Sequence, residues 1–143
     1  MNFFRSLNGR VAALLSAPGP ATVLMLLARL LLAAIFIVSG YSKITGYAGT
    51  QGYMEAMGVP GALLPLVILL ELGGGLALLA GFQARLAALA LAGFTVVAGF
   101  LFHGGADPMQ QIMFMKNLAM AGGLLAVAAN GAGRASLDAE VRD

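Results

Sequence analysis

Four long apolar stretches constrain this chain more than any other feature of its sequence. They cover residues 21–42, 60–80, 84–103 and 110–130. Each is about 20 residues long, and at about 1.5 Å per residue a helix of that length crosses about 30 Å of hydrocarbon. Because 60% of the residues are hydrophobic and only 10% are charged, a water-soluble fold could not bury this much apolar surface. We predict one all-α membrane domain over residues 1–143, an antiparallel bundle of four transmembrane helices.

The composition also excludes several classes of function. The net charge of +2 is spread over a few separate groups with no basic run, which argues against nucleic acid as a partner. The chain has no cysteine, so disulfides, thiolate metal sites and cysteine nucleophiles are ruled out. His103 lies near several methionines, a combination that can ligate copper. Because the sequence has no second histidine and no regular methionine array, we predict no metal site.

The basic residues outside the apolar stretches predict the orientation. Five of them fall on one side of the predicted membrane: Arg5, Arg10, Arg85, Arg134 and Arg142. The connections on the other side, 43–59 and 104–109, carry one basic residue, Lys43. The positive-inside rule therefore places both termini, with the tail 131–143, in the cytoplasm. In residues 1–18 the apolar side chains recur at helical spacing, opposite the arginines. This pattern predicts an amphipathic helix lying in the membrane interface.

Four strongly polar residues interrupt the apolar stretches, where a charge is costly and therefore informative. They are Arg29, Glu71, Lys116 and Asn117. Counted from the predicted cytoplasmic ends, Arg29 and Glu71 lie at similar depth, so we expect them to form an ion pair that Lys116 can approach from the outer side. The face of the first helix that carries Arg29 also carries Ala33, Phe36, Gly40 and Lys43.

These residues form a predicted ligand-binding or buried polar network, and no catalytic residue can be assigned among them. Three further polar residues near the outer side are candidates for the same site: Lys43, His103 and Tyr41. The simplest interpretation is that the buried charges only fix the packing of the helices. The functional alternatives are binding of a polar head group, a proton relay and recognition of a partner protein.

The residues between 24 and 130 resemble the DoxX family of small four-helix membrane proteins. The resemblance depends on these segments in this order: Arg29, Phe36 to Lys43, Met57-Gly58-Val59-Pro60, Glu71-Leu72-Gly73-Gly74-Gly75 with Gly81, and Lys116-Asn117-Leu118-Ala119. It implies a protein of the bacterial inner membrane that serves as a non-catalytic subunit of a quinone-linked oxidoreductase. It also implies a quinone as the ligand and no covalent cofactor.

Two hypotheses follow for the function. In the first, the protein binds a quinone or a similar amphipathic ligand near the Arg/Glu/Lys cluster and contacts a redox-enzyme subunit. In the second, it is a structural or assembly subunit without a ligand, and its outer connection, residues 43–59, contacts a partner. The lipid bilayer is a partner in both cases, and a homo-oligomer is a further candidate. A transporter ranks third, because four helices alone leave little room for alternating access.

Overall fold

Proline and glycine set the ends of the long helices. The structure, a computed structural model, describes residues 1–141. Pro18 and Pro108 begin two of the helices, where the missing amide hydrogen costs nothing. Gly81 ends another with a φ of 71°, a left-handed conformation that favours glycine. The helices are α1 (Asn2–Ser16), α2 (Pro18–Thr45), α3 (Tyr47–Ala56), the 3₁₀ turn η1 (Gly61–Leu63), α4 (Leu64–Ile68), the π-helical turn η2 (Leu69–Gly73), α5 (Gly74–Ala80), α6 (Ala84–Phe102), α7 (Pro108–Asn130) and α8 (Leu137–Glu140).

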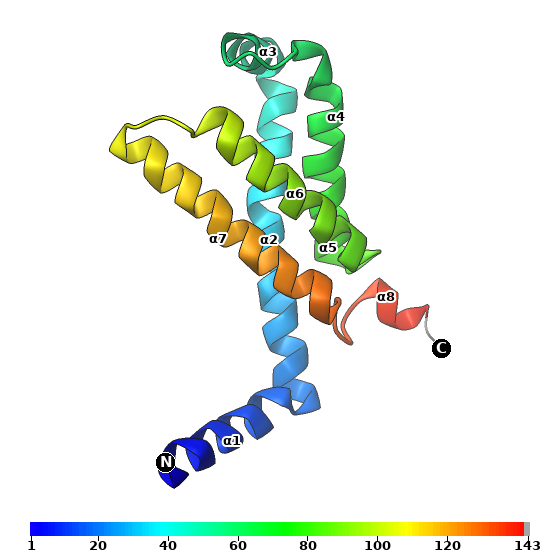
Figure 1. Cartoon of the computed structure of the whole chain (residues 1–143). Helices are drawn as coiled ribbons and strands as arrows, with labels where there is room; N and C mark the ends of the chain where they lie inside the picture. The colour runs from blue at the N-terminus through cyan, green and yellow to red at the C-terminus, as the bar shows by residue number, and fades with distance from the viewer. Residues whose placement is uncertain (142–143) are drawn as a thin grey trace.

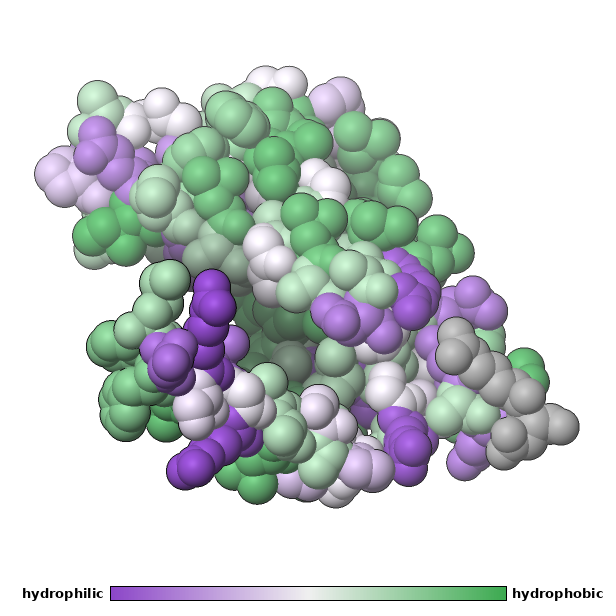
Figure 2. All heavy atoms as spheres, turned by 60° about the horizontal axis from the view of Figure 1, so that its bottom comes forward, coloured by the Kyte–Doolittle hydropathy of each residue, from purple (hydrophilic) through white to green (hydrophobic). Residues whose placement is uncertain are grey.

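The prediction of an all-α protein with four long apolar helices is confirmed. The helices long and apolar enough to cross a membrane are α2, the continuous segment from η1 through α5, α6 and α7. Their bounds lie within three residues of the predicted stretches. Figure 2, turned so that the lower end of Figure 1 comes forward, shows hydrophobic side chains gathered over its upper part and mixed with hydrophilic ones in its lower part. The hydrophobic part of that surface suits contact with lipid chains.

The long helices form two layers. One layer contains α2 beside α4, η2 and α5, and the other is the hairpin of α6 and α7, which crosses the first layer at an angle (Figure 1). Both termini lie toward the same end, together with the α5–α6 turn and α8; we call this the terminal end. Helix α3 and the α6–α7 connection lie toward the opposite end, which we call the loop end.

The layers meet through a core of small and branched apolar side chains. Its buried members are Ala33, Phe36, Leu78, Ala88, Leu91, Ala92, Ala121, Leu124 and Val127. Within the first layer a Cβ at Gly40 would lie 2.9 Å from the backbone nitrogen of Leu72. Such close approach is how membrane helices gain packing energy in the absence of a hydrophobic driving force between them.

Three regions outside the long helices differ in how well the sequence predicted them. The predicted N-terminal helix forms as α1 and is exposed along its whole length, while its position in a membrane interface stays a prediction. The connection 43–59 was expected as a loop but contains the end of α2 and helix α3. The predicted tail folds back as far as it is described: Asp138 accepts hydrogen bonds from the amides of Gln83 and Ala84 at 2.7 and 2.9 Å. Arg142 lies outside the described residues.

The orientation can be tested with single cysteines, because the native chain has none. Ser6 and Glu140 belong to α1 and α8 at the terminal end, and Ala48 belongs to α3 at the loop end. All three positions are exposed and can be changed to cysteine. We expect an impermeant maleimide to label Ala48→Cys in intact spheroplasts and the other two only after permeabilisation, because the arginines favour a cytoplasmic terminal end. The reverse labelling pattern would invert the topology.

Candidate functional site

Glu71 lies at the centre of an irregular turn in the second apolar segment. The segment is not one regular α-helix, because Leu69–Gly73 form the π-helical turn η2. A π turn adds one residue to the helical repeat and so changes the direction of the side chains around it, and such turns are frequent at functional sites. The Glu71 side chain points into the protein and the residue is only 5% exposed.

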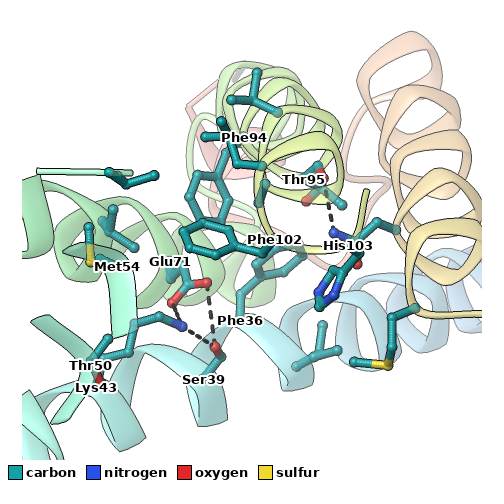
Figure 3. Close-up of a pocket in the computed structure, with 18 of the residues that line it drawn as sticks. Phe36, Ser39, Lys43, Thr50, Met54, Glu71, Phe94, Thr95, Phe102 and His103 are labelled. Atoms are coloured by element: carbon teal, nitrogen blue, oxygen red, sulfur yellow. Dashed lines mark hydrogen bonds and ion pairs between the residues drawn. The ribbon is translucent and has the colours of Figure 1, made fainter. Parts of the chain in front are cut away.

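The carboxylate of Glu71 is paired with two residues of α2 (Figure 3). Lys43 Nζ lies 2.9 Å from Glu71 Oε2, a close ion pair whose alignment is not that of a hydrogen bond. Ser39 Oγ donates to Glu71 Oε1 at 3.4 Å and accepts from Lys43 Nζ at 2.6 Å. Ser39 and Lys43 are four residues apart, so they share one face of α2. These three side chains form a compact polar group inside the apolar bundle.

The predicted ion pair between Arg29 and Glu71 is wrong. Arg29 is buried on the expected face of α2, with Ala33, Phe36 and Gly40, but its Nη2 donates to the carbonyl of Ala135 at 2.6 Å. Arg29 lies beside Gly81 at the end of α5, and ten residues separate Gly81 from Glu71, just as ten separate Arg29 from Ser39. Glu71 therefore lies about 15 Å closer to the loop end than Arg29 does.

Asn117 and Lys116 lie across from this group, on α7. Asn117 is buried and its Nδ2 donates to the carbonyl of Thr95 at 3.1 Å. Lys116 is exposed, and its nearest hydrogen-bonding contact is Met113 Sδ at 3.8 Å. In the described part of the chain no carboxylate lies within 4.0 Å of Lys116 Nζ. Lys116 and Glu71 line the same cavity, but the cation that pairs with Glu71 is Lys43.

A cavity of about 450 Å³ lies between two walls. One wall carries the group of Ser39, Lys43 and Glu71 in the first layer, and the other carries Lys116 and Asn117 in the second. Its polar lining residues are Ser39, Lys43, Thr50, Glu71, Thr95, His103, Lys116 and Asn117. Most of the remaining lining is apolar, including the rings of Phe36, Phe94 and Phe102. Cavities of this size with apolar walls and a few polar groups are typical of small-molecule sites.

The cavity brings together five of the seven predicted site residues. Lys43, Glu71, His103, Lys116 and Asn117 line it, whereas Arg29 and Tyr41 do not. His103 Nδ1 is hydrogen-bonded to Gln110 Oε1 at 2.8 Å, which fixes the ring at the loop end. Tyr41 is 62% exposed on the outer surface of α2, as expected for a residue that anchors a helix at the membrane surface.

Sequence reasoning missed three polar residues of this site, Ser39, Thr50 and Thr95. Ser39 has a detectable signal, because it precedes Lys43 by one helical turn. Thr95 has none, because a single threonine in an apolar helix usually bonds to its own backbone. In this structure Thr95 is 2% exposed, and its buried hydroxyl has no hydrogen-bond partner among the described residues.

Comparisons with known proteins agree with this architecture. The sequence model of the DoxX family matches residues 24–104, which include Ser39, Lys43, Glu71, Thr95 and His103. The chain is 58% identical to the inner membrane protein YqjF of Escherichia coli strain K12 over 115 residues, 80% of this chain and 88% of that protein. It is 33% identical to the inner membrane protein YphA of the same strain over 124 residues, 81% of this chain and 89% of that protein. No solved structure matches the chain. The family match and the two relatives show that this chain belongs to the DoxX family.

Proposed function

We propose that this protein is an inner-membrane subunit that binds a quinone, or a similar amphipathic ligand, in the cavity beside Glu71. In this role it holds the ligand for a quinone-linked oxidoreductase and does not itself transfer electrons. The inner-membrane location is supported by the names of the two relatives and by the four apolar helices.

The unpartnered hydroxyl of Thr95 is the observation that carries the proposal. Thr95 lines the cavity and is 2% exposed, and its hydroxyl oxygen is buried with no hydrogen bond within the described residues. Leaving a buried hydroxyl unsatisfied costs on the order of 1–3 kcal/mol. An oxygen-bearing ligand in the cavity would remove that cost, whereas a bundle built only for packing gains nothing from a polar atom at this position.

The distribution of polar groups supports a ligand whose head group is a flat ring with an oxygen at each of two opposite edges. Ser39, Lys43 and Glu71 come from the first layer, while Thr95 and Asn117 come from the second. In the view of Figure 3 the phenylalanine rings lie among these groups. A quinone ring carries a carbonyl oxygen at each of two opposite edges, so each wall can donate to one of them. Aromatic side chains favour contact with such a ring.

The structural alternative is favoured by a different observation. Lys43 and Glu71 are already paired, and groups that satisfy one another gain little from a ligand. In that case the protein is an assembly subunit whose buried charges position the helices. The two functions differ in whether the purified protein binds a quinone saturably.

A quinone titration of wild type and Thr95→Val tests the proposal. Valine keeps the shape of threonine but removes the hydroxyl, so we expect a dissociation constant about tenfold higher, the equivalent of one hydrogen bond. Binding would be followed by the fluorescence of the tyrosines, one of which, Tyr53, lines the cavity. Thermal unfolding without ligand should show Thr95→Val to be at least as stable as wild type.

Thr45→Val is the matched control. The hydroxyl of Thr45 is exposed and bonds to the carbonyl of Ser42 in its own helix, so this variant should bind as wild type does. Absence of saturable binding in the wild type would favour the structural alternative. Equal affinity of wild type and Thr95→Val would remove Thr95 from the site.

A further inference from the structure

Some residues that line the cavity are also exposed on the outer surface of the bundle. Leu63 is 44% exposed, Val97 is 56% exposed and Leu101 is 46% exposed, and all three line the cavity. A side chain can do both only where the cavity opens. Leu63 belongs to η1 beside α4, and the other two belong to α6, so the opening lies between these elements.

The crossing of the two layers explains this opening. Helix α6 packs on α5 and touches η2, whereas α4 packs against α2, α3 and the turns beside it. The contact with α5 is close: a Cβ at Gly74 would lie 3.2 Å from the side chain of Leu91. Beyond that contact α6 runs away from α4 toward the loop end (Figure 1), so the layers separate on this side.

The other edges of the cavity are less suited to an apolar chain. Between α2 and α7 the exposed lining residues are Ile35 and Lys116, and the ammonium group of Lys116 favours a polar or anionic group there. At the loop end Tyr53 of α3 stacks on Phe102 of α6, with ring centroids 5.6 Å apart. The opening beside Leu63, Val97 and Leu101 is the one whose exposed lining is wholly apolar.

Given the ligand site proposed above, we infer that the ligand is a long-tailed amphiphile whose tail leaves the cavity between α4 and α6 into the bilayer. The head enters from the lipid phase through the same opening and meets the polar groups of the two walls. Leu63, Val97 and Leu101 contact the first part of the tail. A tail of this kind stays in hydrocarbon throughout, so its transfer costs no exposure to water.

Blocking the opening tests this inference. Val97→Trp places a large ring in it, and Leu89→Trp is the control, because Leu89 is 53% exposed on the same helix but does not line the cavity. The probes are a quinone with an isoprenoid tail and the same ring without a tail, titrated into protein in lipid nanodiscs. We expect Val97→Trp to raise the dissociation constant of the tailed quinone at least tenfold and that of the tail-free ring less than twofold. Leu89→Trp should change neither.

The outcomes separate this inference from the function on which it rests. If the wild type binds both probes and Val97→Trp weakens neither, or weakens both equally, the tail does not pass between α4 and α6. If the wild type binds neither probe saturably, the proposed function fails and the inference fails with it. Leu101→Trp blocks the opening one turn farther along α6 and should reproduce the result, and thermal unfolding confirms that each variant is folded.

Discussion

Lys43→Met should lower the free energy of unfolding by about 3 kcal/mol, the usual cost of leaving one partner of a buried ion pair alone. Glu71 is 5% exposed and its carboxylate has two neighbours, Lys43 and Ser39. Without the ammonium group it must either stay charged in an apolar bundle or take up a proton. Both changes weaken the native state relative to the unfolded one. The measurement is denaturant unfolding in detergent, followed by circular dichroism.

Two further variants show whether the loss belongs to the pair. Lys43→Met with Glu71→Leu removes both charges, so the double variant should recover part of the loss. Lys116→Met removes a lysine that is exposed and has no carboxylate within 4.0 Å among the described residues, and it should change stability by less than about 0.5 kcal/mol. Equal losses for Lys43→Met and Lys116→Met would mean that the ion pair does not stabilise the fold.

The sequence predicted which face of α2 is buried but not which residue of that face meets Glu71. Helical spacing places Arg29 and Lys43 on the same side, and the structure confirms that this side faces the bundle. The choice between them depends on how far α5 is shifted along α2. The position of Gly81 beside Arg29 shows that α2 extends well beyond the end of α5. Neither the composition nor the periodicity of the sequence predicts how far α5 is shifted along α2.

The cavity could be predicted only in part, for a related reason. Lys116 and Asn117 were expected near it because polar groups in membrane helices are costly, and both line it. The space itself arises because two helical layers cross and separate toward the loop end (Figure 1). A crossing angle depends on packing between residues distant in sequence. This is also why Thr95, an ordinary residue in an apolar helix, could not be singled out.

The C-terminal segment illustrates a third limit. Residues 131–141 show no regular pattern of apolar side chains, so the sequence predicts no packing for this segment. Yet the segment is held at three points: Ala135 accepts a hydrogen bond from Arg29, Asp138 caps α6, and the amide of Asp138 donates to the carbonyl of Gly81 at 2.9 Å. Arg29, expected in the ligand site, instead anchors this segment.

Gly81→Ala should therefore destabilise the protein by about 3 kcal/mol and release the C-terminal segment. Two costs add: a side chain in a left-handed conformation costs about 1–2 kcal/mol, and the lost hydrogen bond of a charged group costs about 1.5–3 kcal/mol. The φ of Gly81 is 71°, and a Cβ there would overlap Nη1 of Arg29 and Cβ of Ser136. Arg29 would have to move, and its bond to Ala135 would break.

Hydrogen exchange distinguishes release of the segment from general loss of stability. In Gly81→Ala the amide of Asp138 should exchange faster by a larger factor than amides in the middle of α6, because its acceptor is the carbonyl of residue 81. Gly93→Ala is the control: Gly93 lies inside α6 and a Cβ there meets nothing within 4 Å, so alanine should be neutral or stabilise by up to about 1 kcal/mol. A uniform increase in exchange over the whole chain would contradict the role of Arg29 and Gly81 as the anchor. Loss of the anchor should raise exchange in the C-terminal segment more than in the bundle.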